Sequence, residues 1–283
     1  WGERTFVMGI VNVTPDSFSG DGLMAGRKAG RDVAELEAAA VARARLMADE
    51  GADIVDVGGE SSRPGHASVS LDEEIARVVP VVAAIRAALP DVPISVDTTK
   101  RDVAAAALDA GADLLNDVWG VGDSPLSRLA AERGVPIVVM HNRAEARYTN
   151  LIAEVIAELQ RALERAQSAG VPWQHLIVDP GFGFGKAPLH NLALLRSLPA
   201  LAVLGRPILL GTSRKSTLGK VLDLPPEERL EATLATTALA IGAGVDIVRV
   251  HDVRANVRAA RMSDAVVRTR TIGVPVDPAG RQP

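Results

Sequence analysis

The sequence contains no cysteine, which excludes disulfide bonds, thiolate metal sites and a cysteine nucleophile. Aromatic residues are scarce as well, with four Phe, three Trp and one Tyr in 283 residues. The core must therefore be built mainly from Val, Leu, Ile and Ala. The apolar runs are too short to span a bilayer, and a net charge of −4 gives no reason to expect a nucleic acid or a membrane surface as partner. We therefore expect a soluble cytoplasmic protein.

Half of the eight aromatic rings fall just after predicted strands and not within them. These are Phe18, Trp119, Phe182 and Phe184. In a chain with so few rings, this placement predicts that some of them stack on a flat ligand.

A repeated phrase organises the chain. Ala-, Arg- or Glu-rich helical segments end at a glycine, and an apolar run follows within a few residues, at Gly51, Gly111, Gly134, Gly170 and Gly244. Glycine is the usual residue just past a helix, so the rhythm of helix, glycine, buried strand and polar loop indicates a parallel sheet of βα units.

Eight such units can be counted. Strands are predicted at about 6–11, 54–57, 94–96, 114–115, 137–140, 176–178, 208–210 and 247–250. Helices are predicted at about 33–49, 73–88, 101–109, 125–133, 148–168, 189–197, 227–242 and 253–268. Eight units in about 270 residues favour a closed (β/α)₈ (TIM) barrel over a doubly wound sheet. We predict one domain at 1–270 and a loose tail at 271–283.

Polar residues end these strands, where a barrel places its active site. They are Asn12, Glu60 to Arg63, Asp97, Asn116 and Asp117, His141, Asp179, Gly211 to Lys215, and Arg249 to His251. The strand at 176–178 is the most informative, because Asp179-Pro180 ends it and three alternate glycines follow. Taken alone, this stretch also fits a strand that ends in a capped turn.

The side-chain types suggest what this end of the barrel binds. Asp97, Asn116, Asp179 and Lys215 match the N–H and carbonyl groups of an amino-oxo heterocycle. Arg63, Arg249 and His251 with Asn12 suit an anion such as a diphosphate, and a divalent metal on the phosphates is compatible with this set. Arg249 and His251 taken singly fit salt-bridge and capping roles equally well. The segments 181–185 and 211–216 lack the spacing of dinucleotide and Walker loops.

Seven motifs closely resemble the dihydropteroate synthase family. In this sequence they stand at 8–19 (MGIVNVTPDSFS), 58–65 (GGESSRPG), 94–98 (ISVDT), 116–117 (ND), 178–186 (VDPGFGFGK), 211–216 (GTSRKS) and 249–252 (RVHD). The resemblance covers about residues 7–267, in matching order. It implies a (β/α)₈ barrel, usually a homodimer, that joins 4-aminobenzoate to 6-hydroxymethyl-7,8-dihydropterin diphosphate and releases diphosphate with Mg²⁺.

The resemblance also implies residue roles. The pterin would be held by Asp97, Asn116, Met140, Asp179, Phe184, Gly211 and Lys215. The diphosphate would be held by Asn12, Ser62, Arg63, Arg249 and His251, with Asn12 as the Mg²⁺ ligand. The aminobenzoate would lie against Phe18, Ser19, Pro64, Lys215 and Ser216. Of these, Asp97, Lys215, Arg63, Arg249 and His251 are expected to act in catalysis, in which diphosphate leaves first and the arylamine attacks a delocalised pterin cation.

Two departures and two alternatives accompany this interpretation. Ser19-Gly-Asp-Gly22 carries one residue more than the family's usual loop, and Ser62 stands where Thr is more common. A methyltetrahydrofolate-dependent corrinoid methyltransferase would share the barrel and pterin recognition, but it would leave the cationic residues unexplained. A catalytically silent paralogue that binds pterin or a protein is the second alternative.

Overall fold

A computed structural model describes residues 1–14, 33–60, 68–120 and 125–268. Eight parallel strands form the centre: β1 Phe6–Asn12, β2 Ile54–Gly58, β3 Ile94–Asp97, β4 Leu114–Asp117, β5 Ile137–Met140, β6 Leu176–Asp179, β7 Leu209–Leu210 and β8 Ile247–Val250. Their order in the sheet is β6-β5-β4-β3-β2-β1-β8-β7. A parallel bridge between Val178 and Ile208 joins the two edges, so the sheet closes into the predicted barrel.

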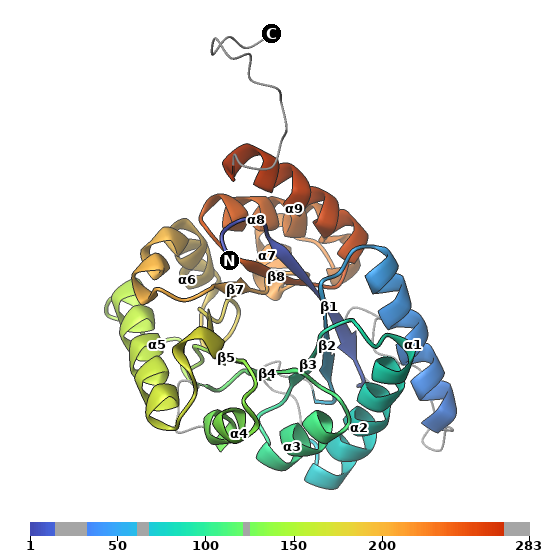
Figure 1. Ribbon diagram of the computed structural model, residues 1–283. Helices are drawn as coiled ribbons and strands as arrows, with labels where there is room; N and C mark the ends of the chain where they lie inside the picture. Colours follow the sequence, from blue (N-terminus) through green and yellow to red (C-terminus); the bar gives the residue numbers. More distant parts are fainter. Residues whose placement is uncertain (15–32, 61–67, 121–124, 269–283) are drawn as a thin grey trace, which may run out of the picture.

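Helices surround the strands on the outside (Figure 1). They are α1 Val33–Asp49, α2 Leu71–Ala88, α3 Arg101–Asp109, α4 Pro125–Arg133, α5 Leu151–Ser168, α6 Pro188–Arg196, α7 Ser216–Leu222, α8 Leu230–Gly242 and α9 Val253–Val267. Short 3-10 turns lie at Trp173–His175, Leu198–Leu204 and Pro226–Glu228. None of the helices in the described ranges is long and apolar enough to cross a membrane.

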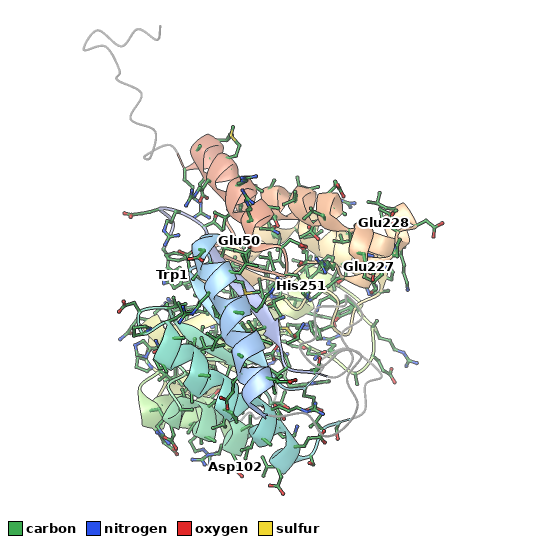
Figure 2. The ribbon with its side chains drawn as sticks, turned by 90° about the vertical axis from the view of Figure 1, so that its right-hand side faces the viewer. Trp1, Glu50, Asp102, Glu227, Glu228 and His251 are labelled. Carbon is green, nitrogen blue, oxygen red and sulfur yellow. The ribbon has the colours of Figure 1, made fainter. Side chains whose placement is uncertain are left out.

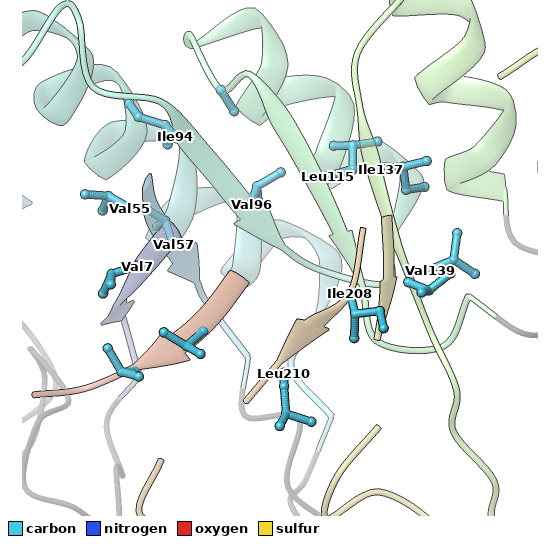
Figure 3. Packing of buried hydrophobic residues seen from close by; sticks show 14 of the residues in the cluster. Val7, Val55, Val57, Ile94, Val96, Leu115, Ile137, Val139, Ile208 and Leu210 are labelled. Atoms are coloured by element: carbon cyan, nitrogen blue, oxygen red, sulfur yellow. The ribbon is translucent and has the colours of Figure 1, made fainter. Parts of the chain in front are cut away.

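The main core lies between the strands and the helix layer. Val55 and Val57 on β2, Val96 on β3 and Val139 on β5 belong to one buried cluster (Figure 3). Because side chains alternate across a strand, the residue between Val55 and Val57 must face the barrel interior. The deeper part of that interior is a second, smaller cluster formed by Met8, Leu114, Val138, Ile177, Leu209 and Ile247. Closer to the carboxyl ends of the strands, the side chains that face the barrel interior become polar. The candidate site lies at this polar layer.

The sequence prediction was wrong at several boundaries. Strands β1, β3, β4 and β6 extend through the polar residue at their carboxyl ends, whereas β7 begins one residue late, at Leu209. Helix α5 begins at Leu151 and not at 148, because the Asn150 side chain accepts a hydrogen bond from the backbone N–H of Ala153 and caps the helix. Ser70 caps α2 in the same way, so that helix starts at Leu71.

One helix was missed. Helix α7 stands between β7 and α8, where the sequence predicted only a loop before a helix at 227–242. That predicted helix in fact begins at Leu230. The predicted tail at 271–283 lies outside the described residues.

Candidate active site at the carboxyl ends of the strands

Arg249 on β8 lies at the centre of the polar layer. Its Nε donates to Oδ2 of Asp56 at 2.6 Å, and its Nη2 donates to Oδ2 of Asp97 at 2.7 Å. Asn116 on β4 donates from Nδ2 to the same oxygen of Asp56 at 3.3 Å. Strand pairing sets this arrangement, because β3 and β4 place Asp97 directly beside Asn116. The site is thus a set of paired charges and not a group of isolated cations.

These pairings shift the proton affinities in opposite directions. Burial raises the pKa of Asp97 to about 7; the charge of Arg249 opposes this, while Asp56, Glu74 and Asp117 add to it. Burial by itself would lower the pKa of Arg249, but Asp56 and Asp97 hold it above its ordinary value. Asp97 therefore takes up or loses a proton near neutral pH, whereas Arg249 stays charged.

Asp179 ends β6 and is fixed by the glycine loop that follows it. Its Oδ1 accepts a hydrogen bond from the backbone N–H of Gly181 at 2.7 Å. Gly181 has φ +70°, and a Cβ there would lie 1.8 Å from the carbonyl oxygen of His141, so only glycine fits. Burial raises the pKa of Asp179, and the charge of Lys215 lowers it. Asp179 is thus held rigidly at the end of its strand.

Lys215 approaches Asp179 from the loop after β7. Its ammonium group donates to the carbonyl oxygen of Phe182 and lies 4.3 Å from the centre of the Phe184 ring. Part of the residue stays exposed, but the ammonium end is enclosed, and burial lowers the pKa of Lys215 to about 8 while Asp179 raises it. The structure therefore brings Lys215, Asp179 and Phe184 together in one group.

The other described candidates also lie around this layer. Met140 is buried at the end of β5, next to Asp179 in the strand register. A Cβ added to Gly211 would lie 3.7 Å from Cβ of Arg249 and 3.9 Å from Nζ of Lys215, so this glycine adjoins both residues. Ser216 begins α7 and is exposed, and Asn12 ends β1 and is half-buried.

His251 follows β8 and is buried. Its Nδ1 lies 2.9 Å from the hydroxyl of Ser213, and its backbone carbonyl accepts a hydrogen bond from Arg43 at 3.0 Å. In Figure 2, His251 lies within the body of the molecule, whereas Asp102 and Glu228 lie on its surface. The loops before α7 and after β8 are thus joined beside Arg249.

Five predicted site residues lie outside the described residues: Phe18, Ser19, Ser62, Arg63 and Pro64. The same holds for Asp21.

The expectation that the rings after the strands stack on a ligand fails for Phe182. Its side chain has no exposed surface and belongs to the core between sheet and helices, although the ring centre lies 5.9 Å from the ammonium nitrogen of Lys215, which also donates to the Phe182 carbonyl oxygen. Trp119 is about half exposed, with 49% of its surface accessible. Phe184 lies nearer to the polar layer than Phe182, with its ring centre 4.3 Å from the ammonium nitrogen of Lys215.

Sequence reasoning missed two residues. Asp56 is fully buried and binds Arg249, yet the segment Ile54-Val-Asp-Val57 was treated only as a strand. A carboxylate inside such an apolar strand is a usable signal, since burial of an unpaired charge is costly. Lys186 ends the motif at 178–186, and the sequence assigns it no role of its own; it is buried and contacts the glycine loop.

In the part of the chain that the structure describes, few oxygen ligands for Mg²⁺ lie at the candidate site. The described residues include no group of three or more His, Asp or Glu side chains that could hold a metal ion. The half-buried amide of Asn12 offers one oxygen ligand at the barrel mouth. This fits an ion that keeps several waters and is bound mainly by substrate phosphates, which is how Mg²⁺ commonly binds in enzymes.

Comparison with known proteins defines the class first. The family described as "Pterin binding enzyme" matches residues 8–251, which include every strand except the first two residues of β1. The chain therefore belongs to the pterin-binding enzyme family.

Within that family the chain groups with the dihydropteroate synthases, which are transferases. It is 49% identical to the dihydropteroate synthase of Clostridium beijerinckii over 269 residues, 94% of this chain and 96% of that protein. A dihydropteroate synthase from Clostridium difficile, solved in the presence of pteroic acid, is 47% identical with a TM-score of 0.87, covering 95% of this chain and 98% of that one. The Xanthomonas albilineans enzyme, solved with 4-aminobenzoic acid, is 42% identical with a TM-score of 0.84 and 94% coverage of both chains.

Proposed function

We propose that this protein condenses 6-hydroxymethyl-7,8-dihydropterin diphosphate with 4-aminobenzoate, giving 7,8-dihydropteroate and diphosphate. The observation that carries the proposal is the convergence of Asp97, Asn116, Asp179 and Lys215 on one end of the barrel, each from a different strand end or loop. The relatives solved with pteroic acid and 4-aminobenzoic acid support the same pair of substrates.

The pterin is recognised by the carboxylates and by Lys215. Asp179 keeps Oδ2 for the ligand, because Oδ1 already accepts from Gly181. Carboxylate oxygens suit the paired N–H groups of the aminopyrimidine edge, and an ammonium group suits the ring carbonyl. Met140 and Phe184 supply apolar surface beside these groups. The heterocycle is therefore bound by residues whose positions the barrel fixes before the ligand arrives.

The diphosphate is held by cationic and amide groups from three segments: Arg249 and His251 after β8, Asn12 on β1, and Ser62 and Arg63 after β2. Arg249 approaches the ligand with Nε and Nη2 already bonded to carboxylates, so it acts as a fixed charge and needs no reorganisation. Mg²⁺ bound to the diphosphate and to Asn12 would neutralise charge on the leaving group.

The reaction follows from this division of charge. The bond between the pterin methylene carbon and the diphosphate oxygen breaks first, and the electron pair leaves with diphosphate. The carboxylates of Asp97 and Asp179 stabilise the cation left on the dihydropterin. The amine nitrogen of 4-aminobenzoate then bonds to the methylene carbon and loses a proton to water. No strong general base is needed, because an arylamine is already neutral at pH 7.

The aminobenzoate is assigned to Lys215 and Ser216 and, from the sequence motifs, to Phe18, Ser19 and Pro64, which lie outside the described residues. Ser216 is exposed beside Lys215 at the start of α7, and its hydroxyl can donate to the ligand carboxylate. The amine end then faces the pterin methylene carbon.

Two further properties belong to the same proposal. A homodimer is supported by exposed apolar side chains on the neighbouring helices α8 and α9, where Leu239, Met262 and Val266 are 65–67% exposed. Light scattering should give twice the mass of the chain, and replacement of Leu239 and Met262 by Glu should give a monomer.

The proposed location is the cytoplasm, and no nucleic acid or membrane takes part.

The test of function is whether the protein forms dihydropteroate from the two substrates in the presence of Mg²⁺. Chromatography detects the product. A methyltetrahydrofolate-dependent methyltransferase would instead transfer a methyl group to a corrinoid and release no diphosphate. A silent paralogue would bind the pterin without forming product. Product formation at a rate that requires Arg249 supports the proposal over both alternatives.

A further inference from the structure

Lys186 is a buried lysine next to the pterin residues, and the reaction does not use it. Its ammonium group has three acceptors: Nδ1 of His141 at 2.8 Å, the carbonyl oxygen of Gly181 at 3.1 Å and the carbonyl oxygen of Phe184 at 3.1 Å. An ammonium group has three N–H donors, so each has one acceptor. The ammonium group of Lys186 thus contacts the glycine loop at 181–185 near both of its ends, at Gly181 and at Phe184.

The glycine loop carries the contacts that define the pterin end of the site. Its first N–H donates to Asp179, its Phe182 carbonyl accepts from Lys215, and its Phe184 ring lies beside that ammonium group. Three of its glycines have positive φ, so the loop has little intrinsic conformational preference. One backbone hydrogen bond, from the N–H of Phe184 to the carbonyl oxygen of Gly181 at 3.1 Å, lies within the loop. The other contacts that shape the loop come from outside it, and Lys186 supplies two of them.

His141 fixes Lys186 in turn. Because Nδ1 accepts from the ammonium group, the ring hydrogen of the neutral imidazole is on Nε2. That nitrogen lies 3.1 Å from Oε2 of Glu158, without hydrogen-bond geometry. Glu158 is itself held by Arg143, whose Nε donates to it at 3.1 Å. The chain of contacts thus runs from α5 through the end of β5 to the loop after β6.

The charges around Lys186 also favour a link to the pterin site. Burial lowers the pKa of Lys186 to about 7; the charge of Asp179 opposes this shift, whereas the charges of Lys215 and Arg143 add to it. Lys186 is therefore coupled through charge to Asp179 and Lys215, two of the groups proposed to contact the heterocycle.

We propose that Lys186, held by His141, is a positioning residue that sets the glycine loop and through it the placement of Lys215 and Phe184 on the pterin. This role rests on the proposed function, because it concerns the pterin half of the same site. It predicts a defect confined to one of the two substrates.

The test is Lys186→Met, which keeps the length and apolar part of the side chain and removes the donors. The exposed Lys220 on α7 provides a matched control as Lys220→Met. We expect the Kd of a pterin ligand, measured by calorimetry, and the KM for the pterin diphosphate to rise about tenfold or more. The KM for 4-aminobenzoate should change less than about twofold, and Lys220→Met should behave as the wild type.

A second pair of variants decides the matter if Lys186→Met does not fold. His141→Asn keeps an acceptor near the place of Nδ1 and should stay within about threefold of wild-type pterin affinity. His141→Leu removes the acceptor and should reproduce the tenfold loss. Equal losses for both substrates, equal behaviour of the two His141 variants, or unchanged pterin binding in Lys186→Met would overturn the inference. Wild-type protein that binds no pterin would refute the proposed function itself.

Discussion

Asp56 accepts a hydrogen bond from Nε of Arg249 at 2.6 Å, although 193 residues separate the two along the chain. Asp56 has no solvent-exposed surface, and its other oxygen, Oδ1, has no hydrogen-bond partner. Burial of a carboxylate with one unpaired oxygen lowers stability through desolvation. This penalty is offset only where the carboxylate pairs with a cation. Asp56 therefore fixes the guanidinium group of Arg249, which in turn reaches Asp97 on β3.

Replacing Asp56 by Asn tests this relationship. The negative charge of Asp56 raises the pKa of Asp97, so its removal should lower that pKa below about 7. The pH at which pterin affinity falls off on acidification should move down with it. An NMR titration of the Asp97 carboxyl carbon measures the shift. An unchanged Asp97 pKa in Asp56→Asn would show that the two carboxylates are not coupled through this layer.

Most of the fold could be predicted from the sequence because each βα unit carries its own local signals. The glycines after the helices and the short apolar runs located all eight strands to within two residues at each end. Helix α7 escaped because Ser216–Leu222 is only seven residues long and contains Gly219, a poor helix former. Side-chain caps such as Asn150 are also local, but they were not used to set the helix starts.

The site could be predicted less completely, for a physical reason. Residues at strand ends can be found one at a time, which is how Asp97, Asn116, Asp179 and Lys215 were identified. Which of them touch depends on the register of strands that are distant in sequence. The pairing of Arg249 with Asp56, and that of Lys186 with His141, exists only once the barrel closes.

Asp179→Asn should lower pterin affinity strongly. The amide carbonyl can still accept from Gly181, but the NH₂ group then faces ligand N–H groups and leaves them without an acceptor. Each unpaired group costs about 1–3 kcal/mol, so the Kd should rise about ten- to a hundredfold or more. Calorimetry measures it, with the exposed Asp102→Asn as control. Pterin binding as tight as in wild type would remove Asp179 from the pterin site.

Arg249→Ala should separate the two parts of the first substrate. The diphosphate ester should lose more affinity than plain hydroxymethylpterin, because only the ester carries the anion. The variant also leaves Asp56 and Asp97 without their cation, which is expected to reduce stability by about 3–5 kcal/mol. The ratio of the two Kd changes cancels that general loss. A ratio of one would mean that Arg249 only neutralises the buried carboxylates.

Lys186 makes stability depend on pH in a defined window. Burial lowers the pKa of Lys186 from 10.5 to about 7, so between these values the unfolded chain binds more protons than the folded one. Its contribution to stability must then rise as the pH rises from about 7 to 10.5, and it falls over the same range on acidification until it levels off below about pH 7. In urea unfolding at pH 7, 8 and 9, the stability of the wild type relative to Lys186→Met should increase with pH. If the free energy of unfolding changes with pH in the same way for the wild type and Lys186→Met, the pKa of Lys186 is not lowered in the folded protein.

We propose that one site of this protein joins a pterin diphosphate to an arylamine. The most direct measurement is of diphosphate release. The protein is mixed with 6-hydroxymethyl-7,8-dihydropterin diphosphate, 4-aminobenzoate and Mg²⁺, and an enzyme-coupled assay detects the diphosphate. We expect one diphosphate per dihydropteroate formed, and we expect release to be lost in Asp179→Asn and kept in Asp102→Asn. Absence of release from wild-type protein that binds the pterin would contradict the account.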